Sequence, residues 1–154
     1  MIVVPKVRLA IPGDAAGIAQ LSRAYIEHGL SWRWTEARVL HAIASRSANV
    51  AVIEDNGTLH AFGIMDYGDE SAHLALLGVQ PAQRRRGLGR ALVLWLEACA
   101  RTAGIGVIRL EARADNAAAI AFYESLGFKV LMRVPGYYAA QLDAIRLEKN
   151  LRAE

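Results

Sequence analysis

The sequence predicts one α/β (α+β) domain over residues 1–154, with a mixed, mostly antiparallel sheet of six to seven strands and about four helices. Three observations lead to this prediction. Strand-like and helix-like hydrophobic periods alternate along the chain, short turns join three consecutive strand-like segments, and no linker, repeat or low-complexity segment divides the sequence. With 154 residues, 54% of them hydrophobic, the chain has the size of one domain with one core.

The N-terminal region is expected to form one strand and two helices. The strand should cover residues 3–10. Pro12, Gly13 and Asp14 then supply a turn and a cap for a helix that continues to about His28. Thr35 is placed to cap a second helix, which should continue through about Ser45.

The loop between these two helices carries two large aromatic residues, Trp32 and Trp34. They could be anchors of the core, because large aromatic side chains bury much apolar area. They could also form a wall of a substrate site, because connecting loops carry specificity more often than regular elements do. Both interpretations stay open from the sequence.

The middle of the chain is expected to form a meander of three strands and a long helix. The strands should cover residues 49–54, 59–67 and 72–79, and their short polar turns predict antiparallel hairpins. The helix should run from Leu88 to about Gly104. Its apolar residues repeat at helical spacing and predict one core stripe, made of Leu88, Ala91, Leu92, Trp95, Leu96 and Cys99.

The C-terminal third is expected to add three strands and a short helix. A strand over residues 107–113 comes first, and Asp115 or Asn116 then caps a helix that Gly127 ends. Two strands follow, over residues 128–133 and 141–148.

Composition excludes several classes of protein. The single cysteine, Cys99, cannot form an internal disulfide and offers no zinc-ligand spacing, and no metal is expected. The apolar runs are far shorter than the roughly 20 residues of a membrane span, and no secretion signal stands at the N-terminus. We therefore expect a cytoplasmic protein that does not enter a membrane.

The most informative stretch, residues 79–92, joins a strand end, a basic glycine loop and the start of a helix. Gly87 and Gly89 let the backbone turn sharply, so that N–H groups can converge on a phosphate at the positive end of the helix. Further charge comes from Arg84, Arg85, Arg86 and Arg90. The P-loop and dinucleotide fingerprints do not fit, since no Gly-Lys-Ser/Thr is present and Leu92 stands where a third glycine is needed. Taken alone, the glycines would also suit an ordinary connection with a solvated basic run.

These residues resemble the GNAT N-acetyltransferase superfamily, whose acyl-CoA loop reads Gln/Arg-x-x-Gly-x-Gly/Ala. Arg84, Gly87 and Gly89 occupy those positions, and residues 116–128 are similar to a second signature, Asn-x-x-Ala-x-x-x-Tyr-x-x-x-Gly-Phe. The resemblance implies the GNAT fold, acetyl-CoA as cosubstrate, and direct attack by a primary amine. It also implies that a loop binds the pyrophosphate, made of Arg84, Arg85, Arg86, Gly87, Leu88, Gly89 and Arg90.

The resemblance extends to the rest of the cofactor site. It implies that the pantetheine arm runs beside Leu77, Gly78 and Val79. A glycine inside a strand often marks a bulge or a close ligand approach, and an N–H freed at Gly78 could point at the thioester oxygen. It further implies that Asn116 hydrogen-bonds the cofactor and that Tyr123 is the acid that protonates the leaving thiolate.

Glu111 is the candidate general base. The spacing from Glu111 to Asn116 and Tyr123 is similar to that of the ribosomal-protein-alanine N-acetyltransferase branch of the superfamily, in which a glutamate so placed is the base. Strand alternation also allows Glu111 to be a salt-bridged surface carboxylate. His73 is the fallback base. A covalent route through Cys99 is not favoured, because it lies about 18 Å along the helix from Gly87.

The acceptor follows from the same resemblance. Tyr137 and Tyr138 resemble a tyrosine pair that helps to close a peptide channel in that branch, which implies a protein N-terminal α-amine as acceptor. A small-molecule amine, amino acid or antibiotic is the alternative, and acidic residues such as Asp66 would favour it. A non-catalytic acyl-CoA-binding module is a third hypothesis. Nucleic acid is not expected as a partner, because no aromatic platform accompanies the basic run. The protein should be a monomer or homodimer.

Overall fold

The computed structural model describes residues 5–84, 86–139 and 141–152. In this part of the chain one sheet has the strand order β1-β2-β3-β4-β5-β7-β6. β4 and β5 are parallel, whereas every other neighbouring pair is antiparallel, which confirms the predicted mixed, mostly antiparallel sheet. The strands are β1 (Arg8–Leu9), β2 (Ala48–Asp55), β3 (Thr58–Tyr67), β4 (Ser71–Val79), β5 (Val107–Arg113), β6 (Lys129–Ala139) and β7 (Leu142–Asn150).

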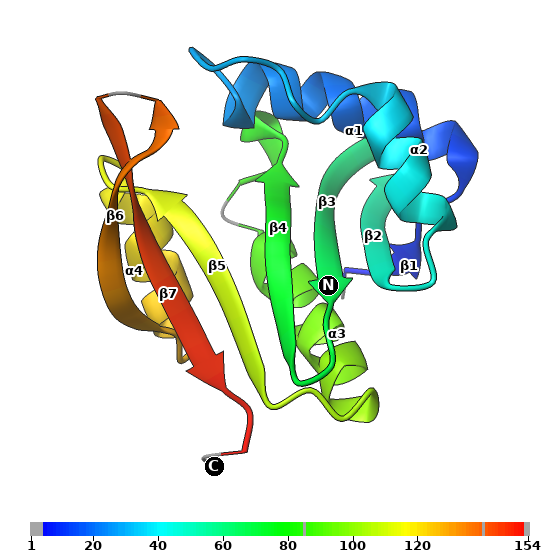
Figure 1. Ribbon diagram of the computed structural model, residues 1–154. Helices are drawn as coiled ribbons and strands as arrows, with labels where there is room; N and C mark the ends of the chain where they lie inside the picture. The colour runs from blue at the N-terminus through cyan, green and yellow to red at the C-terminus, as the bar shows by residue number, and fades with distance from the viewer. Residues whose placement is uncertain (1–4, 85, 140, 153–154) are drawn as a thin grey trace.

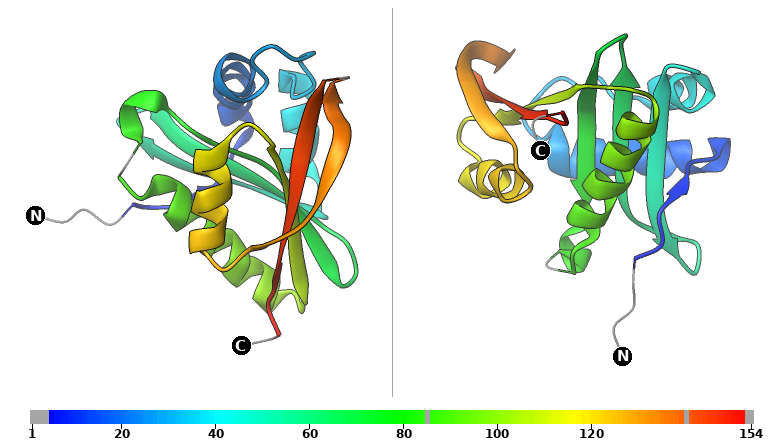
Figure 2. Two further views of the ribbon diagram at one scale, coloured as in Figure 1. Left: turned by 90° about the vertical axis from the view of Figure 1, so that its left-hand side faces the viewer. Right: turned by 90° about the horizontal axis from the view of Figure 1, so that it is seen from below.

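Helices cover both faces of this sheet (Figures 1 and 2). α1 and α2 lie on one face, and α3 and α4 lie on the other. The helices are α1 (Ala15–Leu21), α2 (Glu36–Ala44), α3 (Leu88–Thr102) and α4 (Ala117–Ser125), with 3-10 turns at Pro12–Asp14 and Pro81–Gln83. Among the described residues, no helix combines the length and the apolar composition that crossing a membrane requires.

The sheet separates two hydrophobic clusters, where the sequence suggested one core. One cluster lies under α3 and α4 and includes the fully buried Leu92, Leu96 and Ile108. The other lies under α1 and α2 and includes Ile18 and Phe62. Both faces of the central strands are therefore buried, and this fixes the positions of the strand ends that form the site.

The sheet opens between β4 and β5. Their parallel ladder consists of three residue pairs, Ser71–His73 with Val107–Arg109, and the two strands then diverge (Figure 1). β4 also contains a bulge, since Leu74 and Leu76 pair with consecutive residues of β3 and Ala75 has no partner in that ladder. The divergence leaves a gap in the middle of the sheet.

The helix that was predicted to reach His28 ends two residues earlier and widens before it ends. After Leu21 the chain continues as a π-helical segment, η2 (Ser22–Ile26), in which the N–H of Glu27 donates to the carbonyl of Ser22. The Glu27 carboxylate also turns back to accept from the Ser22 hydroxyl at 2.8 Å. This local pairing accounts for the wider turn. The predicted first strand is limited to Arg8–Leu9 among the described residues.

The core stripe of α3 is rotated from the predicted one. Its buried residues are Leu88, Leu92, Val93, Leu96, Glu97 and Ala100. Ala91, Trp95 and Cys99 of the predicted stripe are half-buried at its side. Glu97 can enter the stripe because the ammonium of Lys149 on β7 lies 2.6 Å from its carboxylate.

β6 is longer than predicted, because it continues beyond residue 133, where the predicted strand ended, to Ala139. The strand passes this point through an irregularity between Val134 and Ala139, with Gly136 at φ +62°. Asp143 on β7 stabilises it by accepting from the Arg133 side chain at 2.7 Å and from the Gly136 N–H at 2.8 Å. Tyr137 and Tyr138 therefore project from a strand.

Candidate active site

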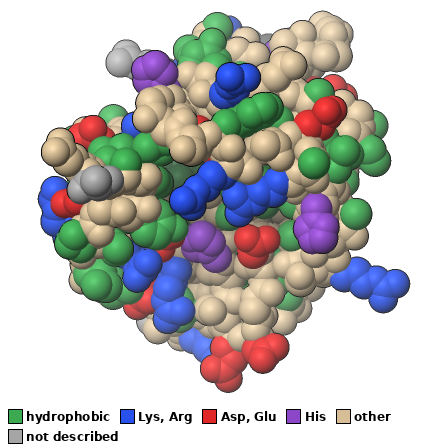
Figure 3. All heavy atoms as spheres, turned by 45° about the horizontal axis from the view of Figure 1, so that its top comes forward, with side chains coloured by type: hydrophobic (Ala, Val, Ile, Leu, Met, Phe, Trp, Pro, Cys, Tyr) green, Lys and Arg blue, Asp and Glu red, His purple; other side chains and the backbone are tan. Residues whose placement is uncertain are grey.

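A cleft of about 1220 Å³ occupies the gap between β4 and β5. Residues from η2, the segment that follows it, the loop before α3, α4 and β6 complete its walls. In Figure 3, basic side chains gather beside histidine and acidic side chains near the middle of the face that looks onto this opening. The cleft thus joins segments that are far apart in the sequence.

The glycine loop forms one end of the cleft. Gly87 has φ +78°, a left-handed conformation that favours glycine, and α3 begins directly after it. A Cβ on Gly89 would lie 3.2 Å from the ring of Phe122 on α4, so the two elements approach closely only because this residue is glycine. The first N–H groups of α3 have no acceptor within the helix, and Leu88, Gly89 and Arg90 at this helix end line the cleft.

The charges around this end suit a pyrophosphate. Arg84 and Arg90 line the cleft, whereas Arg86 is exposed and does not line it; Arg85 lies outside the described residues. The side-chain Oε1 of Gln83 is buried beside the cleft without a hydrogen-bond partner in the described structure. A left-handed glycine, a free helix N-terminus and two arginines fit the polyanionic end of acetyl-CoA.

The end of β4 forms a wall of the cleft. Leu77, Gly78 and Val79 all line it. A Cβ on Gly78 would lie 2.7 Å from the Phe62 ring and 2.8 Å from Ile26, so glycine is required here by packing against the opposite core. The bulge that was predicted at Gly78 lies at Ala75 instead.

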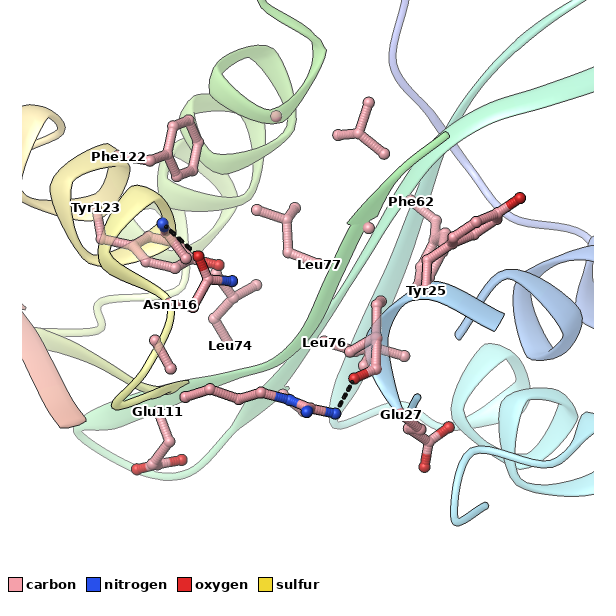
Figure 4. A pocket seen from close by; sticks show the side chains of 18 of the residues that line it. Tyr25, Glu27, Phe62, Leu74, Leu76, Leu77, Glu111, Asn116, Phe122 and Tyr123 are labelled. Atoms are coloured by element: carbon pink, nitrogen blue, oxygen red, sulfur yellow. Dashed lines mark hydrogen bonds between the residues drawn. The ribbon is translucent and has the colours of Figure 1, made fainter. Parts of the chain in front are cut away.

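α4 contributes Asn116 and Tyr123, which lie on the same side of the cleft (Figure 4). The Asn116 side-chain oxygen accepts from the Ala119 N–H at 3.0 Å and caps the helix. This contact leaves the amide NH₂ of Asn116 to face the cleft. The Tyr123 ring packs edge-on against Phe122 and Phe128. Burial raises the pKa of Tyr123, so its phenol carries a proton at neutral pH.

Glu111 projects from β5 away from Asn116 and Tyr123 (Figure 4). Three side chains hold its carboxylate. Its Oε1 lies 2.6 Å from His73 Nε2 and accepts from the Tyr137 hydroxyl at 3.1 Å. Its Oε2 accepts from Arg146 Nε at 2.8 Å. The side chain is only 7% exposed. The Glu111 carboxylate is therefore buried rather than solvated, and it is engaged by three neighbouring side chains.

These contacts decide the protonation state of Glu111. Burial by itself would raise the pKa of the carboxyl group, but the hydrogen bonds from His73, Arg146 and the Tyr137 hydroxyl lower the pKa to about 2. The carboxylate is charged at every physiological pH and has little affinity for a proton.

The predicted tyrosine pair lines the cleft next to Glu111. The Tyr138 hydroxyl donates to the backbone oxygen of Glu111 at 3.1 Å, and the two tyrosine rings meet edge-on with centroids 4.9 Å apart. Burial raises the pKa of both phenols, so they are hydrogen-bond donors at neutral pH.

The two tryptophans of the η2–α2 segment have different environments. Trp34 is 8% exposed and belongs to the core under α1 and α2, and it also lines the cleft. The Arg38 guanidinium lies 3.8 Å from its ring centroid. Trp32 is 37% exposed, stacks with Arg23, and does not line the cleft. The structure brings Trp34 to the site, but not Trp32.

Sequence reasoning missed Glu27, which shapes the acceptor side of the cleft. It is 8% exposed and accepts from the Ser22 hydroxyl and from the N–H groups of Arg33 and Trp34, the latter two at 2.7 Å and 3.2 Å. These bonds fold residues 27–34 back on themselves. An isolated glutamate at a helix end gives no motif by which it could have been found.

Arg113 had been noted in the sequence only as part of the Glu111 motif, and the structure gives it a bridging position. Its Nη2 donates to the carbonyls of Ile26 and His28, each at 2.8 Å. These carbonyls stand at the end of η2, so the arginine links β5 to the opposite side of the cleft. It tethers the segment that Glu27 organises.

Among the described residues, the potential metal ligands are dispersed and the cysteine lies apart from the cleft. No group of three His, Cys, Asp or Glu residues there could hold a metal ion. Cys99 lies on α3 away from the cleft, and burial raises the pKa of its thiol.

Comparison with known proteins agrees with this geometry. Residues 18–128 match the family model described as the acetyltransferase (GNAT) family. The ribosomal protein bS18-alanine N-acetyltransferase of Escherichia coli is 38% identical over 105 residues, which cover 68% of this chain and 70% of that protein.

Solved structures support the same assignment. The ribosomal-protein-S18-alanine N-acetyltransferase from Escherichia coli has a TM-score of 0.83 at 28% identity, covering 98% of this chain and 96% of that one. The structure of yncA from Salmonella typhimurium with acetyl-CoA has a TM-score of 0.78 at 25% identity, covering 97% of this chain and 95% of that one. The chain therefore belongs to the acetyltransferase (GNAT) family, and it is an N-acetyltransferase that uses acetyl-CoA.

Proposed function

We propose that this enzyme acetylates the α-amine of a protein N-terminus. The observation that carries the proposal is the tyrosine pair of β6, whose hydroxyls reach the side chain and the backbone of Glu111 at the wall of the cleft. Two phenols held in this way can bind the backbone of an extended peptide. The identity to a ribosomal-protein-alanine N-acetyltransferase supports the same class of acceptor.

The proposed roles divide the cleft into two halves. Arg84, Arg90 and the N-terminus of α3 would hold the pyrophosphate, and Leu77, Gly78, Val79 and Asn116 would line the path of the pantetheine arm. When bound, acetyl-CoA supplies the thioester from which the acetyl group is taken. Tyr123 keeps its proton at neutral pH and would donate it to the departing sulfur.

The charge state of Glu111 favours an α-amine over a lysine side chain. An α-amine has a pKa of about 8, so a useful fraction is already neutral near pH 7, whereas a lysine amine with a pKa of about 10.4 is almost fully charged. The Glu111 carboxylate, with a pKa of about 2, is too weak a base to deprotonate a lysine ammonium. The site therefore suits an α-amine, of which a fraction is already neutral.

The test is an acetylation assay with located products. The protein is incubated with acetyl-CoA and matched peptides that have a free α-amine, a blocked α-amine, or a blocked α-amine with a free lysine, and the acetyl group is located by mass spectrometry. We expect transfer to the free α-amine and none to the fully blocked peptide. Transfer to lysine alone would contradict the proposal.

A small cationic amine is the second candidate acceptor. The exposed carboxylate of Asp66 lines the cleft beside His73 and could attract such a molecule. The neighbouring acidic residues Asp69 and Glu70 do not line the cleft. Adding polyamines, free amino acids and an aminoglycoside to the same assay separates the two acceptor classes.

A further inference from the structure

We propose that His73, held by Glu111, is the base that removes the proton from the acceptor amine, and that Glu111 is a positioning residue. The inference rests on the proposed function, because it assigns a role within the same reaction. It replaces the assignment that the sequence motif suggested, in which Glu111 itself takes the proton.

The first step of the argument is that both oxygens of the Glu111 carboxylate already accept hydrogen bonds. His73 and Tyr137 occupy Oε1, and Arg146 occupies Oε2. With 7% of its side chain exposed, there is little room for an amine or a water to reach either oxygen. A carboxylate that is paired with a guanidinium in this way is stabilised in its charged form.

The second step is that His73 is accessible where Glu111 is not. Its side chain is 42% exposed. It stands in the last residue pair of the β4–β5 ladder, at the point where the two strands diverge. His73, Asp66 and Glu111 also line a second cavity of about 590 Å³, so His73 lies at the junction of two openings.

The third step is the direction of the hydrogen bond between the two residues. Since the carboxylate is charged, the contact of 2.6 Å requires that Nε2 of His73 carries the hydrogen and donates it to Glu111. In the neutral imidazole Nδ1 is then unprotonated, and it is free to accept a proton. A carboxylate that fixes the tautomer of a histidine in this manner is a known arrangement for a general base.

The proton transfer balances without any further reactant. The N–H bond of the acceptor ammonium breaks, its proton forms a new bond to Nδ1, and the electron pair stays on the amine nitrogen for attack on the acyl carbon. The imidazolium that results lies beside the charged Glu111, which stabilises it. The proton later passes to solvent from the exposed side chain.

The charged and titratable groups that face His73 agree with this role. Asp66 is its direct partner across β3, Glu111 and Arg109 come from β5, Tyr137 from β6 and Arg146 from β7. Arg109 is paired with Glu148 at 3.2 Å, and Arg146 is paired with Glu111. Asp66 thus adds a second carboxylate on the side from which a cationic amine would approach.

The test compares His73→Gln with His41→Gln, a control on α2 that lies outside the cleft. Turnover, KM and acetyl-CoA binding are measured from about pH 6 to about pH 9.5 on whichever amine the wild type acetylates. We expect His73→Gln to lower kcat about 10²-fold near pH 7 with acetyl-CoA binding unchanged. The loss should shrink above about pH 8, because the α-amine then loses its proton to solvent. His41→Gln should behave as the wild type.

A second variant separates a base from a structural role. Added imidazole should restore part of the activity of His73→Gly, and it should have no such effect on Glu111→Gln. Glu111→Gln should lose less activity than His73→Gln. A loss in His73→Gln that is the same at every pH, an absence of rescue by imidazole, or a larger loss in Glu111→Gln would each overturn the proposal.

The two proposals fail in different ways. If the wild type acetylates only small amines, the N-terminal acceptor is wrong, and the His73 test proceeds on the small amine. If the wild type acetylates peptide α-amines and His73→Gln keeps full turnover, the acceptor stands and the assignment of the base is wrong.

Discussion

Glu111 shows how neighbours that are distant in the sequence set the chemistry of one residue. Its motif placed it next to the reaction, and the structure keeps it there. Its three partners come from β4, β6 and β7, so no local pattern could reveal that its charge is already balanced. The same contacts that make it a poor base make it a strong support for the residues around it.

This ion pairing predicts a specific loss of stability in acid. The pKa of Glu111 is lowered from 4.5 to about 2 in the folded protein, so its contribution is present above about pH 4.5 and is lost as the pH falls toward 2. The shift corresponds to on the order of 3 kcal/mol. Glu111→Gln lacks this titration.

Urea unfolding at several pH values measures the effect. Between about pH 5 and about pH 2, the free energy of unfolding of the wild type should fall more steeply than that of Glu111→Gln. Equal slopes for the two proteins would show that the carboxyl group is not stabilised by folding.

Tyr123→Phe tests the proposed acid on the other side of the cleft. The substitution removes the hydroxyl and keeps the ring that packs on Phe122 and Phe128, so folding should be unaffected. We expect turnover to fall by roughly 10²-fold or more, because the thiolate then leaves without a proton donor. Acetyl-CoA binding, measured by calorimetry, should stay close to that of the wild type. Full turnover in the variant would remove Tyr123 from the mechanism.

The residues that the sequence identified share one property, which is fixed spacing within a short segment. Asn116 and Tyr123 belong to one helix, and Gly87 and Gly89 belong to one turn, so a motif can specify them. Glu27 and Arg146 act through contacts with segments far away in the chain. Trp32 was a candidate for the substrate wall but does not line the cleft. The sequence predicts that it lies in a loop, but it does not predict the direction in which the side chain points.

At the scale of elements, β4 is where the two cores and the cleft meet. Gly78 has no room for a side chain on the face that contacts Phe62 and Ile26. The bulge at Ala75 changes which face each later residue of the strand presents, because it adds one residue to the alternation. Leu76 therefore packs under α1 and α2, whereas Leu74 packs under α3 and α4.

Gly78→Ala is expected to destabilise the protein by about 1–3 kcal/mol, since the added methyl group overpacks a filled core. The measurement is the urea midpoint. Gly13→Ala is the matched control, because a Cβ at Gly13 would meet nothing within 4 Å. A Gly78→Ala protein as stable as the control would mean that Phe62 and Ile26 can move aside.

Elements with complete local signals were predicted closely, and others were not. The Thr35 cap of α2 is present, since its hydroxyl accepts from the Arg38 N–H at 3.3 Å, and the hairpins of β2, β3 and β4 formed as expected. The π-helical end of α1 depends on the Glu27 carboxylate, and the extension of β6 depends on Asp143 of the neighbouring strand. The first is a side-chain contact within one helical turn and the second is a contact between neighbouring strands, and neither follows from the turn and helix signals of the sequence.

At the scale of the whole molecule, two halves of a sheet are held apart at one end and together at the other. At the closed end are the short β4–β5 ladder and the buried pair of Glu97 on α3 with Lys149 on β7. At the open end, Arg113 reaches across the cleft to the end of η2. Arg113 therefore helps to set the width of the cleft at this end.

Arg113→Gln should loosen residues 27–34 and raise the KM for the acceptor by about tenfold, because hydrogen bonds from a charged group contribute on the order of 1.5–3 kcal/mol. Acetyl-CoA binding should change little, since the glycine loop lies at the other end of the cleft. Arg46→Gln, an exposed substitution away from the cleft, is the control. An unchanged KM in Arg113→Gln would show that the bridge does not position the acceptor segment.

The gap between β4 and β5 gives this sheet two inner edges in addition to its outer ones. Beyond His73, the backbone amides of β4 on that side have no strand partner, so an extended ligand can complete the sheet as a strand would. Deuterium should therefore replace the amide protons of residues 75–79 that face the gap quickly in the free enzyme. Bound acetyl-CoA should slow that exchange. Protection of these amides that appears only with the ligand would show that the ligand takes the place of the absent strand partner.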